Sequence, residues 1–205
     1  MTAWMPPFID WGVASRTLAG QPASGDLGVV LPFDAGVLVA VLDGVGHGDE
    51  AAAAAKAADK VLRQQPDAPV VDLIERCHEA LIGTRGVVMS LASFNAAEGT
   101  MSWSGVGNVE GVLVRADGRP TPRREALLLR GGVVGFNLPS LTVEVLAVAP
   151  GDTLTFATDG VYSAFEVGLR NTLSPQRLAE SILAQHAKGT DDALALVAVF
   201  RGERT

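Results

Sequence analysis

Apolar side chains recur along this chain with two different periods, and the changes of period predict its helices and strands. From Asp49 to Gln65 apolar residues, mostly alanines, recur every three or four positions with charged residues between them, which predicts an amphipathic helix. The same spacing predicts helices from Val70 to Ile82 and from Pro175 to about Lys188, the last capped by Ser174. Short apolar runs bounded by turn residues predict strands at 10–14, 27–31, 36–42, 87–95, 100–106, 111–115, 126–130, 141–148, 153–158 and 193–200.

The order of these elements indicates the fold class. Strands dominate, with two helices early and one late, so the chain is an α+β sandwich and not a series of alternating βαβ units. The segment Pro32–Ala35 is a predicted hairpin turn between two strands. Because no Ser/Gly-rich linker or internal repeat interrupts the pattern, residues 1–205 are predicted to form a single domain.

Composition narrows the classes of partner. The 205 residues are 48% hydrophobic and 19% charged, which is typical of a globular chain with a sizeable core. The net charge of −7 disfavours nucleic acid, and the one dense basic run, Arg119–Arg124, contains two prolines and is interpreted as a solvated loop. No apolar stretch is long enough to span a bilayer, and no signal peptide opens the chain. Cys77 is the single cysteine and is interpreted as structural, and a chain that cannot form an internal disulfide fits a reducing compartment. We therefore expect a cytoplasmic protein without membrane contact.

Aspartates stand at the ends of several predicted strands. Asp26 precedes one strand, Asp43 and Asp159 each end one and are followed by glycine, and the pair Asp191–Asp192 precedes the last. A carboxylate at the edge of a buried strand is desolvated unless a cation or a donor meets it, and Mg²⁺ and Mn²⁺ prefer such oxygen ligands. Taken singly, an aspartate beside a strand is more often a turn residue. The set is therefore suggestive of a metal site without proving one.

Four motifs give the set its specificity. SGD (24–26), VLDGVGHGDEA (41–51), FATDGVYSAF (156–165) and TDDALALVAVF (190–200) occur in this order. Together they resemble the SpoIIE-type bacterial branch of the PPM (type-2C) metal-dependent serine/threonine phosphatases, over about residues 10–201. The short form without a sensor or kinase module looks most like the RsbX-type phosphatases of the stressosome. The resemblance implies an αββα sandwich of two mostly antiparallel sheets flanked by helices.

The resemblance also implies roles for particular residues. Two divalent cations, Mn²⁺ or Mg²⁺, are expected, with Asp43 bridging both. The Gly44 carbonyl and Asp26 would hold one cation, and Asp159 and Asp191 the other. Asp43 and Asp159 are thus the expected catalytic residues, in a family where a metal-bridging water attacks the phosphoserine or phosphothreonine. Asp192 is expected to support its neighbours.

Three positions need separate treatment. Leu194 stands where the family usually has threonine, and we expect a small packing change there. Arg16 is a candidate phosphate ligand but is better interpreted as a solvent-exposed arginine. His47 is a candidate general acid, with a structural role in the glycine-rich turn favoured. The SGVGN segment around Asn108 lacks a GxGxxG pattern, and we expect it to turn the chain beside the site.

The functional hypothesis is a phosphatase that acts on a phosphorylated STAS-domain regulatory protein in a bacterial partner-switching or stressosome pathway. Two alternatives stay open. One is a non-catalytic binding module of the same fold that sequesters a STAS-type partner. The other is a structural domain stabilised by metal. Intact aspartates at all the expected ligand positions count against the binding module.

Overall fold

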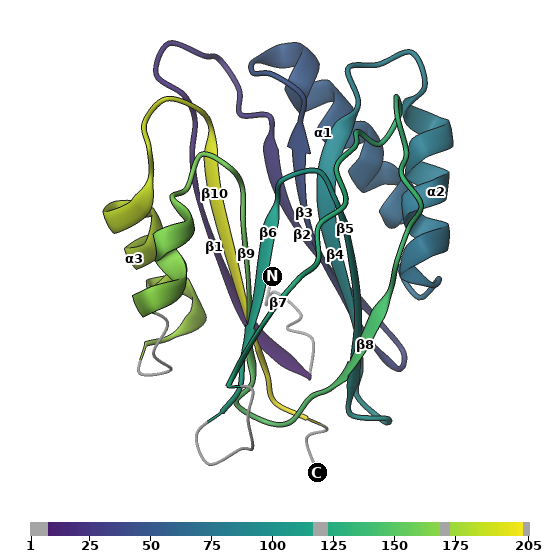
Figure 1. Cartoon of the computed structure of the whole chain (residues 1–205), viewed down its shortest axis with the longest axis vertical. Helices are drawn as coiled ribbons and strands as arrows, with labels where there is room; N and C mark the ends of the chain where they lie inside the picture. The colour runs from purple at the N-terminus through teal and green to yellow at the C-terminus, as the bar shows by residue number, and fades with distance from the viewer. Residues whose placement is uncertain (1–7, 117–122, 169–172, 203–205) are drawn as a thin grey trace, which may run out of the picture.

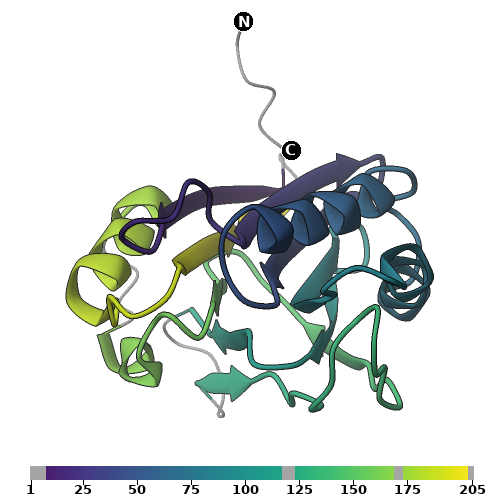
Figure 2. The same ribbon diagram turned by 90° about the horizontal axis from the view of Figure 1, so that it is seen from above.

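The computed structural model describes residues 8–116, 123–168 and 173–202, and it is an αββα sandwich (Figure 1). One sheet has the strand order β1-β10-β9-β6-β7 and the other β2-β3-β4-β5-β8, with every pairing between neighbouring strands antiparallel. Seen from above, α3 lies on one side of the sandwich and α1 and α2 on the other (Figure 2). The predicted fold class is confirmed. The strands are β1 (Ile9–Arg16), β2 (Asp26–Phe33), β3 (Gly36–Gly44), β4 (Val87–Asn95), β5 (Thr100–Val106), β6 (Glu110–Val114), β7 (Arg124–Ala126), β8 (Glu144–Ala147), β9 (Thr153–Ala157) and β10 (Ala193–Phe200), and the helices are α1 (Asp49–Leu62), α2 (Val70–Leu81), the 3₁₀ helix η1 (Ser163–Gly168) and α3 (Pro175–His186).

The layers explain why the central strands are apolar along their whole length. In β3, the valines at 37, 39 and 41 enter the core between the two sheets, whereas Leu38, Ala40 and Leu42 face α1 and α2. In β10, Leu194 and Leu196 point into the same inter-sheet core, and the alternate residues pack against α3. A strand covered on both faces needs apolar residues at every position, which produces the continuous runs seen in the sequence.

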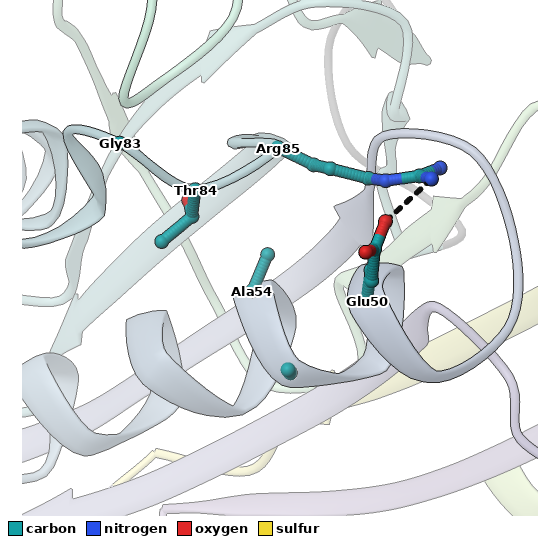
Figure 3. A pocket seen from close by; sticks show the side chains of 6 residues that line it. Glu50, Ala54, Gly83, Thr84 and Arg85 are labelled. Carbon is teal, nitrogen blue, oxygen red and sulfur yellow. Dashed lines mark ion pairs between the residues drawn. The ribbon is translucent and has the colours of Figure 1, made fainter.

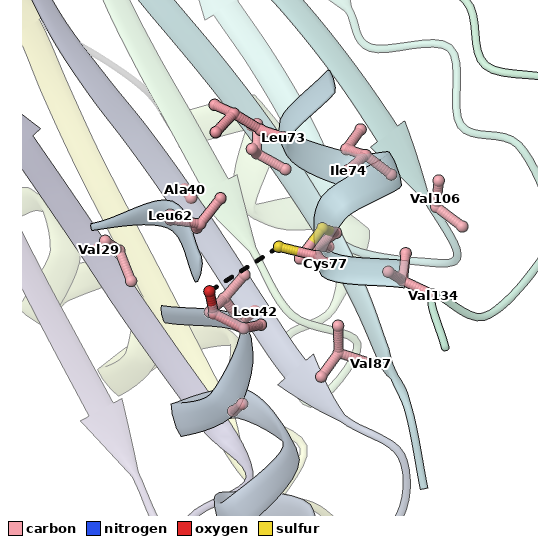
Figure 4. Packing of buried hydrophobic residues seen from close by; sticks show 14 of the residues in the cluster. Val29, Ala40, Leu42, Leu62, Leu73, Ile74, Cys77, Val87, Val106 and Val134 are labelled. Carbon is pink, nitrogen blue, oxygen red and sulfur yellow. Dashed lines mark hydrogen bonds between the residues drawn. The ribbon is translucent and has the colours of Figure 1, made fainter. Parts of the chain in front are cut away.

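The helices are built to pack closely on their sheets. Alanines of α1 form most of its buried face, and Leu62 completes it. Across from them α2 buries Leu73, Ile74 and Cys77, the last with its thiol donating to a carbonyl of α1 (Figure 4). Burial raises the pKa of the Cys77 thiol to about 12, so this cysteine is a core residue as predicted.

The hairpin at the far end of β2 and β3 is tighter than expected. Strand β2 continues through Pro32 and Phe33, and only Asp34 and Ala35 form the turn. The proline is tolerated because β2 is the edge strand of its sheet, where a missing N–H leaves no ladder partner unsatisfied. The predicted four-residue turn was wrong in this respect.

The predicted strand at 126–130 was also wrong. Strand β7 ends at Ala126, and the following residues run from one sheet to the other. The Leu127 N–H donates to Gly111 on β6, while Arg130 donates to Gly105 on β5. Leucines along this crossing alternate between buried and exposed like a strand, although no continuous ladder forms. The strand expected at 141–148 is shorter in the structure, where only β8 pairs with β5 at the edge of its sheet.

Other boundaries move by a few residues. Helix α1 ends at Leu62 where Gln65 was expected, and α3 ends at His186. Ser174 caps α3 as predicted, its hydroxyl accepting the Arg177 N–H at 3.4 Å. Most of the basic run 119–124 lies outside the described residues. Within the described segments, no helix combines the length and apolar character needed to cross a bilayer.

Candidate active site

The strand-end aspartates meet at one end of the sandwich, the upper end in Figure 1. Asp26 opens β2 and Asp43 lies near the end of β3, and the two are direct partners in the antiparallel register. From the other sheet come Asp159, two residues after β9, and Asp191, two residues before β10. Antiparallel topology therefore places carboxylates from both sheets at a common edge, as the sequence indicated.

Thr158 joins the two sheets at this edge. Its hydroxyl donates to Asp26 Oδ2 at 2.8 Å and accepts the Leu194 N–H at 2.9 Å. Because the second contact uses the backbone of Leu194, its side chain is free to fill the inter-sheet core, where it is buried. The departure from the family's threonine is accommodated as a packing change.

Two glycines allow the motif segments to approach one another. A Cβ on Gly160 would lie 1.8 Å from the Asp192 carbonyl oxygen, so any larger residue would push the Asp159 turn away from the last motif. A Cβ on Gly44 would lie 2.1 Å from the Ala51 carbonyl oxygen, which fixes the glycine-rich loop against α1. Gly44 also donates its N–H to the Gly25 carbonyl at 3.1 Å, so the SGD segment lies beside it.

Asp192 holds the loop between β1 and β2. Its Oδ1 accepts the Leu18 N–H and its Oδ2 accepts the Gly25 N–H, both at 2.7 Å. The side chain is buried, and both oxygens are occupied by backbone donors. Asp191 is less buried, and its Oδ1 accepts the N–H of Asp192 at 2.8 Å. The geometry therefore separates Asp192, which holds the loop, from Asp191, whose Oδ2 accepts no hydrogen bond from the described part of the chain.

Asp159 is positioned by two residues to which the sequence gave no role. The amide of Asn108 donates to Asp159 Oδ2 at 2.7 Å, and the Lys188 ammonium donates to the Asp159 carbonyl oxygen at 2.6 Å. Lys188 also lies 5.4 Å from the ring centre of Tyr162, within cation–π range. The SGVGN loop was expected to lie beside the site, and it does, but the contact of Asn108 with an aspartate was not foreseen.

The clustered charges change the acidity of two carboxyls. Burial raises the pKa of Asp43 to about 8, and the charges of Asp26, Asp159, Asp191 and Asp192 add to the rise. Burial likewise raises the pKa of Asp26 to about 7, although the Thr158 hydrogen bond opposes the effect. Desolvated carboxyls of this kind favour protonation or a nearby cation.

The donor set fits hard divalent cations. Asp43 is buried enough to have a strongly raised pKa, and within the described residues no donor hydrogen bonds to its carboxylate. In the same described ranges, no three His, Cys, Asp or Glu side chains are arranged so that they could hold one ion together. Mg²⁺ retains several waters and needs only one or two carboxylates, so an open cluster of oxygen ligands is compatible with it.

The two remaining candidates lie at the rim. His47 is exposed in the glycine-rich loop. Arg16 is exposed at the end of β1, opposite Ala193 in the strand register, and therefore next to the last aspartate motif. The expectation of an exposed Arg16 is met, at a position adjoining the site.

The arrangement of layers and the carboxylate end define a fold of the PPM, or type-2C, phosphatase class. The Stage II sporulation protein E (SpoIIE) profile matches residues 34–201. This chain therefore belongs to the SpoIIE family.

Relatives of known structure agree with this assignment. A chain from work on "The bacterial stressosome: a modular system that has been adapted to control secondary messenger signaling" is 28% identical, with a TM-score of 0.83 over 93% of this chain and 98% of the other. RsbX crystallised with magnesium has a TM-score of 0.84 at 21% identity, over 96% and 98% of the two chains. The catalytic domain of the serine/threonine phosphatase PstP, in complex with two manganese ions, gives 0.68 at 16% identity over 95% and 99%. At these lower identities the likeness shows the fold alone.

One curated relative matches in sequence. The phosphoserine phosphatase RsbX of Bacillus subtilis (strain 168) is 29% identical over 94 residues, which are 46% of this chain. The match spans about half of the relative, 47% of its length.

Proposed function

We propose that this protein is a metal-dependent phosphoserine/phosphothreonine protein phosphatase that acts in the cytoplasm, with residues 1–205 as one domain. One observation carries the proposal. Buried and half-buried carboxylates from two sheets converge at one edge, with Asp26 directly opposite Asp43 in the strand register. Membership of the SpoIIE family and the likeness to RsbX support the same reaction.

In this proposal each residue of the cluster has a distinct task. Asp26, Asp43 and the Gly44 carbonyl would hold one divalent cation, and Asp43, Asp159 and Asp191 would hold a second. Asp192 keeps the β1–β2 loop against the site through its two backbone contacts. Bound Mn²⁺ or Mg²⁺ would lower the pKa of a water, which could then lose a proton and attack phosphorus in line as hydroxide. Solved relatives containing magnesium or two manganese ions support this choice of cations.

The proposed substrate is a phosphorylated STAS-domain regulatory protein. Support comes from the stressosome relative and from the RsbX phosphoserine phosphatase. Selectivity gives a physical reason, because Asp43, Asp159 and Asp191 are only half-buried and a metal site near the surface makes few contacts beyond the phosphate. Binding energy that distinguishes substrates must then come from the rest of a folded partner.

A non-catalytic binding module is the less favoured alternative. Such a module would still bear the cost of burying Asp26 and Asp43, whose raised pKa values show how poorly this edge tolerates their charges. Sequestering a partner requires no carboxylates at that position. Retaining all of them is explained by cation binding and turnover.

The test is hydrolysis of p-nitrophenyl phosphate and of a phosphoserine-containing protein, with Mn²⁺ and with excess EDTA. We expect turnover of both with Mn²⁺ and its loss on chelation. Asp159→Asn should lose activity, while the matched charge change Asp34→Asn, in the exposed hairpin at the opposite end of β2 and β3, should retain it. Hydrolysis that persists in EDTA, or an inactive wild-type protein that still binds a STAS domain, would reject the proposal.

A further inference from the structure

A pocket of about 440 Å³ lies beside the carboxylate cluster and belongs to no step described above. It opens between the first turns of α1 and the loop that joins α2 to β4 (Figure 3). Its floor is small and apolar, and a charged pair stands at one end. The lining residues are Glu50, Ala53, Ala54, Gly83, Thr84 and Arg85.

The pocket is continuous with the glycine-rich loop of the site. The Val45 N–H donates to the Gly86 carbonyl at 3.1 Å, which joins that loop to the α2–β4 loop. The Arg85 guanidinium lies over Gly46, where a Cβ would come within 2.7 Å of its Nη1. Gly46 is three residues from Asp43, a separation of at most about 11 Å. A chain with its phosphorylated residue at Asp43 can therefore reach Arg85 with a side chain about three residues away.

The arginine at the end of the pocket can exchange its present partner for another carboxylate. Arg85 pairs with Glu50 at 2.5 Å, but both side chains are largely exposed, at 48% and 71%. Exposed pairs of this kind contribute at most about 1 kcal/mol, so an incoming carboxylate can replace Glu50 at small cost. Arg115 contrasts with it, because it is 11% exposed and pairs with both Glu125 and Asp152.

Two apolar side chains are exposed near the α2–β4 loop. Ile82 is 67% exposed at the end of α2, and Phe136 is 83% exposed in a neighbouring loop. The Gly135 N–H donates to His78 Nδ1 at 2.9 Å, and its backbone packs on Leu81, which fixes Phe136 close to the α2–β4 loop. Exposed apolar groups rimmed by charges are typical of surfaces that bind another protein.

We propose that this pocket is a docking subsite for the substrate protein, holding the chain that flanks the phosphorylated residue. The occupant is a segment with a carboxylate about three residues from the phosphoserine, which pairs with Arg85, and an apolar side chain that covers the floor and Ile82. The inference rests on the proposed function and adds a preference to it. That preference opposes the net charge of −7, which by itself repels acidic segments.

Two synthetic phosphoserine heptapeptides test the subsite. They differ only at their first and last residues, which are Asp in one and Lys in the other, and their termini are blocked. The measured quantity is the ratio of kcat/KM for the Asp peptide to that for the Lys peptide, with Mn²⁺ at low salt. A ratio within one enzyme is independent of how much of its metal site is intact.

We expect the wild-type protein to favour the Asp peptide about fivefold, the upper range for one exposed ion pair, with the preference shrinking in high salt. Arg85→Glu should invert the ratio, and Arg85→Lys should keep its direction. The matched control is Arg63→Glu, which changes an exposed arginine paired with Asp59 at the far end of α1 and should leave the ratio within about twofold.

The possible failures are distinguishable. A wild-type ratio near one, or a ratio unchanged by Arg85→Glu, overturns the subsite and leaves the phosphatase proposal standing. Equal loss of both peptides in Arg85→Glu would place Arg85 on the phosphate itself, which also overturns the subsite. Wild-type protein that releases no phosphate from either peptide or from p-nitrophenyl phosphate overturns both proposals.

Discussion

Replacing Asp43 by asparagine should strengthen the metal-free fold and remove its response to cations. Asp43 is held among four other aspartates, and burial raises its pKa from 3.8 to about 8. Asparagine has nearly the same shape without a charge. If the native fold tolerates this carboxylate only because a cation compensates it, the neutral side chain is the more stable one in EDTA.

The pKa fixes both the sign and the pH window of the effect. Between about pH 4 and pH 8 the folded protein binds more protons at this position than the unfolded chain, so metal-free stability falls as the pH rises. A rise from 3.8 to about 8 corresponds to about 6 kcal/mol above pH 8, as an upper limit. Partial exposure and the unpaired amide of asparagine reduce the gain, and we expect about 2 kcal/mol at pH 8. For a chain of this length that is a rise in Tm of about 4–8 °C.

Thermal unfolding between pH 5 and pH 8.5, in EDTA and in Mn²⁺, measures these changes. The wild-type Tm should fall as the pH rises in EDTA and should increase again when Mn²⁺ is added. Binding of Mn²⁺ at a hundredfold excess over Kd adds about 2.7 kcal/mol to the free energy of unfolding. The Asp43→Asn variant should show a flatter, higher curve in EDTA and no recovery, while Asp34→Asn behaves as wild type. An Asp43→Asn protein that is less stable than wild type in EDTA, or that gains as much from Mn²⁺, would refute the reasoning.

Three further outcomes follow from the site geometry. Asp191→Asn should lower activity more than Asp192→Asn does. We expect Asp192→Asn to lower activity about 10–100-fold while Mn²⁺ binding, measured by calorimetry, is retained. Equal losses of activity would contradict the roles given to the two residues. Asn108→Ala removes the 2.7 Å contact to Asp159 and should weaken Mn²⁺ affinity about tenfold, so unchanged affinity would show the contact to be incidental. Catalytic efficiency on a phosphorylated STAS protein should exceed that on a phosphopeptide from the same loop at least about tenfold, roughly 1.4 kcal/mol of transition-state binding, and comparable values would indicate a generalist enzyme.

The fold was predictable where local pattern and tertiary environment agree. Both β3 and β10 are buried on two faces, and their unbroken apolar runs in the sequence indicated this burial. The leucines at 127–129 misled because alternation reflects which side chains are buried, not whether the backbone pairs in one sheet. That segment contacts β6 at one end and β5 at the other, which no local pattern encodes.

The site was predictable as a set of strand ends, and less so as a set of contacts. Their positions at strand ends only suggested that Asp26, Asp43 and Asp159 would meet, and the resemblance of the four motifs to a known family made the set specific. The roles of Asp191 and Asp192 could not be distinguished from their adjacent positions in the sequence. The roles differ because only Asp192 accepts hydrogen bonds from the backbone of the β1–β2 loop. The contact of Asn108 joins residues 51 positions apart, and the spacing of a sequence carries no signal for it.

The Thr158 hydroxyl, directly after β9, binds Asp26 of β2 across the gap between the sheets, at the end where the clustered carboxylates raise one another's pKa. At the opposite end of β2 and β3, the Asp34–Ala35 hairpin joins these two strands of one sheet, away from the carboxylate cluster. We therefore expect the carboxylate end of β2 and β3 to open more readily than the hairpin end when no cation is bound. Amide hydrogen exchange should be uneven along each of these strands: fast near Gly44 and Asp26 when cations are withdrawn, and indifferent to them near Gly36. A cation bound by carboxylates of both sheets would then hold this end of the sandwich together.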